Sequence, residues 1–476
     1  MEVQFINLFR HHIAALLPGH TTCSLWTPLI IQALHEEPAI RFASLALCAS
    51  LPIRSQMVTR PHMHPPYSFT QYQRALSSLR ALLSNEDLRS REAALITCIL
   101  LMCFEVISDH PEIALLHLEH ALRILKRAEY AVDDSLIQAY VRLDIQASTY
   151  MGDRTPMITL PNEMSLPSIF SSLREAEAFL RAVQNKLFHF VKSKANVYRY
   201  SEPGHIPLEV LGAIKDLKKR LQRWKTTFLS SLKLVRSLHD YKTVGSINLL
   251  QIHHLTSTIL AANCLYSEET IYDQYDAEFT SIVNLSERLL SSSSSNETGY
   301  STKASDICAP SSDQCLDKWN ISVDLGIIQP LYVTATKCRI SSLRRHAVSL
   351  MRRSFHQEGI WNGPIMAKVA QRVIEVEEGR EEGTLNILAT DAMPPTLSRA
   401  TQGPDANAGT QLTTYCSLAS ELRPLEHKRV HGIIRNVDAK RLRARVVCSR
   451  RANGMDGEWD HVESIVHWTR DDLLTG

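Results

Sequence analysis

Residues 93–104 read AALITCILLMCF and form the most apolar run in the chain. The run belongs to a predicted helix from Leu88 to Ile107 whose second half is apolar on every side, and such a helix is buried inside a protein. It is shorter than the roughly 20 apolar residues that cross a bilayer. We therefore expect it at the centre of a soluble helical bundle. Asn85 is the predicted N-cap, with Glu86 and Asp87 at the positive end of the helix.

Helical periodicity extends in both directions from this central segment. Apolar residues recur every three or four positions from Phe69 to Leu83, and a third helix is predicted from Glu112 to Ala128 after the break at His110 and Pro111. Short connections of this kind favour antiparallel neighbours. Beyond a loop at 156–167, further helices are expected around 214–228, 249–265, 279–290, 331–354 and 364–378. The predicted fold class is all-α, a large helical bundle over residues 1–380.

Two stretches lack any periodicity, and the C-terminus differs from the rest. A serine-rich insertion, 291–314, is predicted to be mobile, and 389–411 lies in a Pro- and Gly-containing linker assigned to 381–425. Residues 429–437 and 442–448 alternate as the strands of a β-hairpin do, with 458–468 as a third-strand candidate. We expect 426–476 to form a small β-hairpin extension that packs on the bundle.

Composition limits the classes of partner. The 476 residues carry 52 Lys and Arg against 50 Asp and Glu, a formal net charge of +2. This balance provides no global field for nucleic acid or an anionic membrane, so any charged partner must meet a local patch. The N-terminus lacks the basic start and cleavage site of a secretory signal. Composition leaves the cytoplasm or the nucleus as the expected location, and we expect no membrane partner.

Motifs for catalysis and metal binding are missing from the sequence. It contains no nucleophile elbow, zinc-protease signature or phosphate-binding loop, and its 17 glycines include no dinucleotide-binding turn. His117 and His120 are one helical turn apart among leucines, and we interpret them as structural. His62 and His64 are interpreted as loop residues, and the pair Cys308 and Cys315 cannot complete a four-thiolate shell. No catalytic, cofactor-binding or metal residue is predicted.

Two groups of arginines are the candidate site residues. Arg344, Arg345, Arg352 and Arg353 form two pairs eight residues apart near one helix, close to Lys337 and Arg339. Arg441, Arg443 and Arg445 lie in the predicted hairpin. The functional interpretation is a basic contact surface or a nuclear import signal. The alternative is an ordinary solvated face, partly balanced by the acidic run that includes Glu375, Glu377 and Glu378.

Several sequence blocks, in order, resemble one known family. The blocks are Phe5-x-x-x-Phe9, Trp26-Thr-Pro-Leu-Ile, Tyr72-x-x-Ala75-Leu76-x-x-Leu79, Cys103-Phe104-Glu105, Glu358-Gly359-Ile360-Trp361 and Val373-Ile374-Glu375. Together they are similar to the fungal-specific transcription factor domain, the helical regulatory region of fungal zinc-cluster transcription factors. Family members carry an N-terminal zinc cluster with C-x2-C-x6-C spacing. None of the ten cysteines here forms a C-x2-C pair, and the matching helices begin at residue 2, so we expect no zinc cluster in this chain.

The resemblance implies a transcriptional regulator located in the nucleus, with the cytoplasm as the alternative, that acts through protein partners, a DNA-binding partner subunit or a small effector. Direct DNA contact by this chain alone is not expected, and control of a metabolite biosynthesis gene cluster is an inference by analogy. Two alternatives stay open: a helical interaction scaffold outside transcription, and an enzyme whose site carries no recognisable motif.

Overall fold

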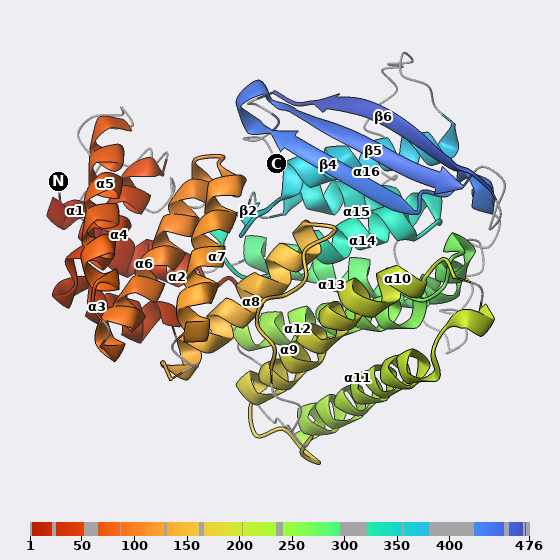
Figure 1. Ribbon diagram of the computed structural model, residues 1–476, viewed down its shortest axis with the longest axis horizontal. Coiled ribbons are helices and arrows are strands. Elements are labelled where there is room, and N and C mark those ends of the chain that lie inside the picture. Colours follow the sequence, from red (N-terminus) through yellow and green to blue (C-terminus); the bar gives the residue numbers. More distant parts are fainter. Residues whose placement is uncertain are drawn as a thin grey trace, which may run out of the picture.

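The computed structural model describes residues 2–20, 25–51, 65–85, 87–127, 131–160, 166–201, 203–234, 241–295, 321–354, 357–379, 423–451, 457–469 and 472. Most of the described chain is helical, with two small sheets (Figure 1). The predicted all-α class with a small C-terminal β element is confirmed. No described helix combines the length and apolar character needed to cross a membrane.

The N-terminal helices surround the apolar segment from which the prediction began. They are α1 (Glu2–Leu8), α3 (Ile30–Glu36), α4 (Pro38–Ser50), α5 (Pro65–Leu83), α6 (Leu88–Ile107), α7 (Pro111–Arg127) and α8 (Asp134–Tyr150). On α6, every residue from Ala93 to Val106 is buried. Its cap is Asp87, whose side chain accepts the Ser90 N–H at 2.9 Å, and not Asn85 as predicted. Asp87 lies directly before the first helical residue, where a cap must stand to reach the free N–H groups.

A second set of helices carries its own core. It contains α9 (Leu173–Phe190), α10 (Asn196–Tyr198), α11 (Leu208–Leu234) and α12 (Tyr241–Asn263). The predicted stripe Ile214, Leu217, Leu221, Trp224 and Phe228 is the buried face of α11. On α12, Leu249 and Ile252 belong to the large core, whereas Leu250 and Ala261 belong to the smaller one. This helix therefore joins the two cores.

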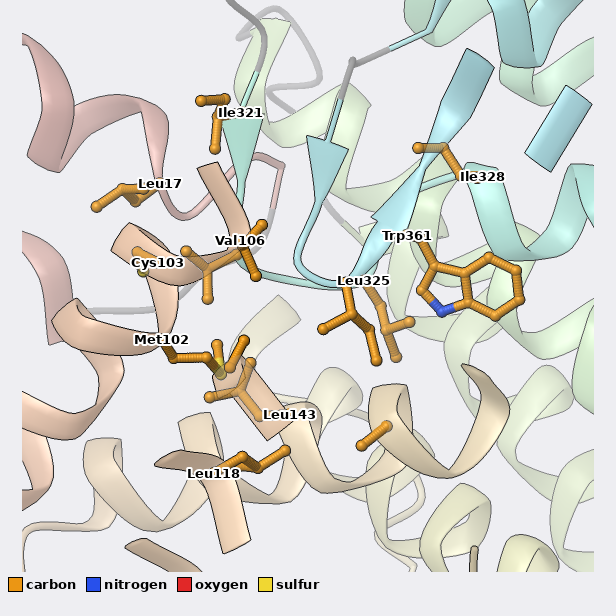
Figure 2. Packing of buried hydrophobic residues seen from close by; sticks show 14 of the residues in the cluster. Leu17, Met102, Cys103, Val106, Leu118, Leu143, Ile321, Leu325, Ile328 and Trp361 are labelled. Carbon is orange, nitrogen blue, oxygen red and sulfur yellow. The ribbon is translucent and has the colours of Figure 1, made fainter. Parts of the chain in front are cut away.

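The last helices enclose a three-stranded sheet of very short strands. They are α13 (Asp276–Ser295), α14 (Ile328–Lys337), α15 (Ser341–Arg353) and α16 (Gly363–Glu378), and the strands are β1 (Ile321–Ser322), β2 (Gln357–Glu358) and β3 (Trp361–Asn362). The buried Glu358 carboxylate accepts the Ile327 and Ile328 N–H groups at 2.9 and 2.8 Å, which fixes where α14 begins. Figure 2 shows the central packing, with Met102 of α6, Leu143 of α8 and Leu325 among its side chains.

Two predicted boundaries in this region were wrong. The single helix expected at 331–354 is two helices, because Cys338 is extended (φ −71°, ψ 145°) and the turn after it directs Arg339 inward. The serine-rich insertion was predicted to begin at Ser291, yet residues 291–295 continue α13. The rest of that insertion, and the linker up to residue 422, lie outside the described residues.

The C-terminal extension is a three-stranded antiparallel sheet of β4 (Gly432–Asp438), β5 (Arg443–Arg451) and β6 (Trp459–His467). The predicted hairpin and its third strand are confirmed. Ala444, Val446 and Cys448 of β5 are buried on one face and belong to the large core. The sheet packs against α16 through β5 and β6 (Figure 1). The division of the chain into the predicted domains remains a prediction.

Candidate interaction surfaces

One of the predicted contact residues, Arg344, lies inside the protein and not on its surface. Arg344 is 1% exposed, and its Nη2 lies 2.6 Å from Glu377 Oε2. Arg339 shares the same carboxylate at 2.8 Å, and its neighbour Lys337 donates to both oxygens of Glu269. Sequence reasoning expected Arg344 in a solvent-facing pair, which is wrong: its guanidinium is buried, where the Glu377 carboxylate and the Ala335 carbonyl, 2.8 Å from Nε, compensate the cost of removing the charge from water.

This buried charge cluster (Arg199, Glu269, Lys337, Arg339, Arg344 and Glu377) also fastens the C-terminal extension. Glu377 accepts the Val430 N–H at 2.7 Å, and Lys337 donates to the Val430 and His431 carbonyls at 3.2 Å. Arg429 forms a double contact with Asp273, at 2.9 and 2.8 Å. The cluster joins the segment before β4 to three parts of the bundle, so its ionic groups have a structural role.

Arg435 of β4 makes a second attachment between the sheet and the bundle. Its guanidinium carbon lies 4.7 Å from the ring centre of Tyr150, 5.2 Å from that of Tyr332 and 5.0 Å from that of Trp361. Nη2 also donates to the Tyr150 carbonyl at 2.6 Å. A cation enclosed by three rings is held by both electrostatic attraction and packing. Arg435 therefore attaches the sheet to the bundle.

Acid is expected to weaken the attachment of the extension through Glu426. Burial opposes ionisation of this half-buried carboxyl, but His431 and the Glu269 and Thr270 N–H groups lower its pKa from 4.5 to about 2. A depressed folded-state pKa stabilises the protein above the unfolded value and loses that effect as pH falls. Thermal unfolding across pH should show wild type more stable than Glu426→Gln above about pH 5, with the difference shrinking towards pH 2. A difference that stays constant over this window would contradict the role of Glu426.

The other predicted arginines lie outside the core. Arg345 pairs with Glu378 at 2.7 Å and is 38% exposed, whereas Arg352 and Arg353 are exposed at the end of α15. On the outward face of the sheet, Arg445 pairs with Glu463, and the Arg443 side chain lies 3.9 Å from the Asp438 carboxylate. Arg441 lies in the turn between β4 and β5, 3.8 Å from the same carboxylate. Because Arg344 is buried, the seven predicted residues do not all belong to one surface patch.

Sequence reasoning missed a basic surface on α11. Lys215, Lys218, Lys219, Arg223 and Lys225 are all exposed there, and we name this set the α11 basic stripe. Among the described residues, no acidic side chain lies within ion-pair distance of these five, while Asp216 pairs with Arg220 at 2.7 Å. The helix runs along the outer edge of the molecule (Figure 1). The signal was present in the sequence as the polar face opposite the apolar stripe.

One cavity of the described chain lies between the two cores. It has a volume of about 160 Å³ and lies between α8, α9, α12 and α14. Its polar groups include Gln184, which donates to Ser257 at 3.0 Å, and His253. Burial, aided by nearby Arg181, lowers the pKa of His253 to about 3, so the imidazole is neutral at pH 7. Such a cavity accommodates a small, largely apolar molecule.

Of the two histidines that were interpreted as structural, His117 makes a contact inside the bundle and His120 is exposed. His117 Nε2 lies 3.1 Å from the Tyr72 hydroxyl, and burial lowers the pKa of this imidazole. Within the described ranges, no three His, Cys, Asp or Glu side chains are arranged to hold a metal ion. His62, His64, Cys308 and Cys315 lie outside the described residues.

The arrangement as a whole is that of a helical module whose candidate contacts lie on its surface. Residues 4–373 match the fungal specific transcription factor domain, and the chain belongs to that family. It is therefore a fungal transcriptional regulator, as the resemblance predicted. Among curated proteins it is similar to the aspercryptin biosynthesis cluster-specific transcription regulator atnN of Emericella nidulans, at 21% identity over 431 residues that cover 73% of this chain and 69% of the relative. No solved structure matches the chain.

Proposed function

We propose that this regulator acts in the nucleus through protein contacts of its helical domain and without a zinc cluster of its own. The observation that carries the proposal is the family match over residues 4–373, which spans the helices of both cores. Within the 476 residues no two cysteines have the C-x2-C spacing of the cluster. No catalytic step is assigned to the chain.

The exposed arginines complete the proposal. Arg352 and Arg353, with Arg441, Arg443 and Arg445 on the sheet, are proposed to contribute to nuclear import or to contacts with partners. A DNA-binding partner subunit would supply the sequence recognition. The relative is named for control of a biosynthesis cluster, and we extend that role to this chain: its targets are the genes of a metabolite pathway. The cavity beside His253 supports a second route of control, by a small apolar effector.

Deletion and tagging of the gene in its native fungus test this function. We expect a tagged chain to accumulate in nuclei, and deletion to change the transcripts of a coherent set of neighbouring genes. The purified chain alone should bind DNA duplexes weakly and lose that binding as salt increases, since only backbone charge would be read. Exclusion from nuclei under all growth conditions, or unchanged transcripts after deletion, would contradict the proposal.

A further inference from the structure

A groove opens beside the α11 basic stripe, between α11, α12 and α13. Its volume is about 320 Å³. The floor consists of stacked rings: Trp224 and Phe228 have centroids 4.6 Å apart at 15°, and Trp224 and His254 have centroids 5.1 Å apart at 18°. His254 Nε2 lies 3.0 Å from the Leu221 carbonyl oxygen, a contact that fixes the position of this imidazole in the floor. The floor is therefore apolar and preorganised.

The walls of the groove combine apolar, polar and basic groups, since Gln251, Ser281 and Asn284 also line it and Arg288 adds a second cation. Leu229 of α11 is 44% exposed, and Leu255 and Leu285 line the opposite side. Lys225 stands at the rim, within the stripe. Further along the same side of α11, Leu208 is 86% exposed and Leu211 is 40% exposed. Exposed leucines interleaved with lysines favour a partner that presents both an apolar and an acidic group.

Charge and shape identify the occupant. From Lys215 to Lys225 the stripe extends over about 15 Å of helix, at 1.5 Å per residue, which matches a short peptide segment. The groove has the size of one large hydrophobic side chain with its surroundings, as in recognition of amphipathic peptides. Nucleic acid fits less well, because Trp224 and Phe228 are 1% and 2% exposed and offer no free ring face for bases.

We propose that the groove between α11, α12 and α13, together with the α11 basic stripe, binds an acidic protein segment that carries a large hydrophobic anchor residue. The anchor enters above the stacked rings, between Leu229 and Leu285, and flanking carboxylates contact Lys225 and, nearer the start of α11, Lys219 and Lys215. Only the assignment of this segment to the transcription machinery rests on the proposed function. The surface itself is argued from the geometry and charge of α11.

Peptide titration tests this assignment. The probe is a fluorescent synthetic peptide of about 16 residues, rich in Asp and Glu, with one central Trp. It is compared with the same peptide carrying Ala in place of Trp and with a 20-base-pair duplex. We expect micromolar binding of the Trp peptide and at least about tenfold weaker binding of the Ala peptide. The variant K215E/K219E/K225E should weaken binding of the Trp peptide by at least about tenfold, because attraction becomes repulsion at three positions.

The matched control is K126E/R127E, which reverses two exposed charges at the end of α7 and should change affinity by less than about twofold. Since all of these side chains are exposed, circular dichroism should show intact folding, and the single variants K219E and K225E serve if the triple variant is unstable. Equal binding of the Trp and Ala peptides, no binding at 100-fold the expected concentration, or tighter binding of the duplex through the same lysines would overturn the proposal. Peptide binding by a chain whose deletion leaves transcripts unchanged would contradict the proposed function and leave this inference standing.

Discussion

Replacing Glu377 with alanine is expected to cost the protein about 3–5 kcal/mol of stability, because a buried ion pair loses one partner and leaves its charge uncompensated. Glu377 is 1% exposed and is the carboxylate shared by Arg339 and Arg344, which are equally buried. The same change removes the acceptor for the Val430 N–H, so the C-terminal extension loosens as well. Chemical denaturation followed by circular dichroism measures the loss.

The neighbouring residue provides the control. Glu378 pairs with Arg345 at 2.7 Å, but both side chains are partly exposed, and Glu378→Ala should cost less than about 1 kcal/mol. The two variants differ by one position on α16 and remove the same chemical group. Similar losses from the two would show that burial of the charge cluster is not what makes Glu377 important.

Arg435→Ala is expected to release the C-terminal sheet and to cost about 3 kcal/mol. A desolvated cation–π contact contributes about 2 kcal/mol, and a hydrogen bond from a charged donor contributes about 1.5–3 kcal/mol, with the two not fully additive. The Arg435 guanidinium contacts Tyr150, Tyr332 and Trp361 at the same time. Hydrogen exchange of the β4 and β5 amides should therefore accelerate in this variant, while the amides of α6 keep their protection.

Two further variants make the test specific. Arg435→Lys keeps the charge but not the planar group that stacks on the rings, and should recover only part of the protection. Arg445→Ala removes an exposed arginine of the same sheet, 52% exposed and paired with Glu463, and should leave exchange nearly unchanged. If the β4 amides of Arg435→Ala exchange as slowly as those of the wild type, Arg435 does not attach the sheet to the bundle.

Local patterns predicted much of the fold. The apolar run on α6, the stripe on α11 and the alternation in the C-terminal strands each depend on residues near one another in the chain, and each is confirmed. The break at residues 338–340 could not be predicted in the same way. It depends on Glu377, which lies almost 40 residues beyond Arg339. From periodicity alone, the helix was predicted to continue without a break at this position.

The candidate surfaces show the same limit. Counting arginines placed Arg344 on a surface, because sequence spacing contains no information about which carboxylates lie opposite. The lysines of α11 were passed over although the apolar stripe on its other face was recognised. An amphipathic helix has two faces, and a dense basic face with leucines in it was readable from residues 208–233. The groove was not readable, since α12 and α13 contribute its other walls.

The most direct test of the proposed protein contact on α11 measures transcripts in a strain whose native gene carries K215E/K219E/K225E. We predict that the transcripts altered by gene deletion change in this strain too, while the variant protein stays at its normal level and in the nucleus. The strain carrying K126E/R127E, whose two exposed charges lie on α7, should keep normal transcripts. Normal transcripts in the K215E/K219E/K225E strain would contradict the claim that this regulator acts through a protein contact on α11.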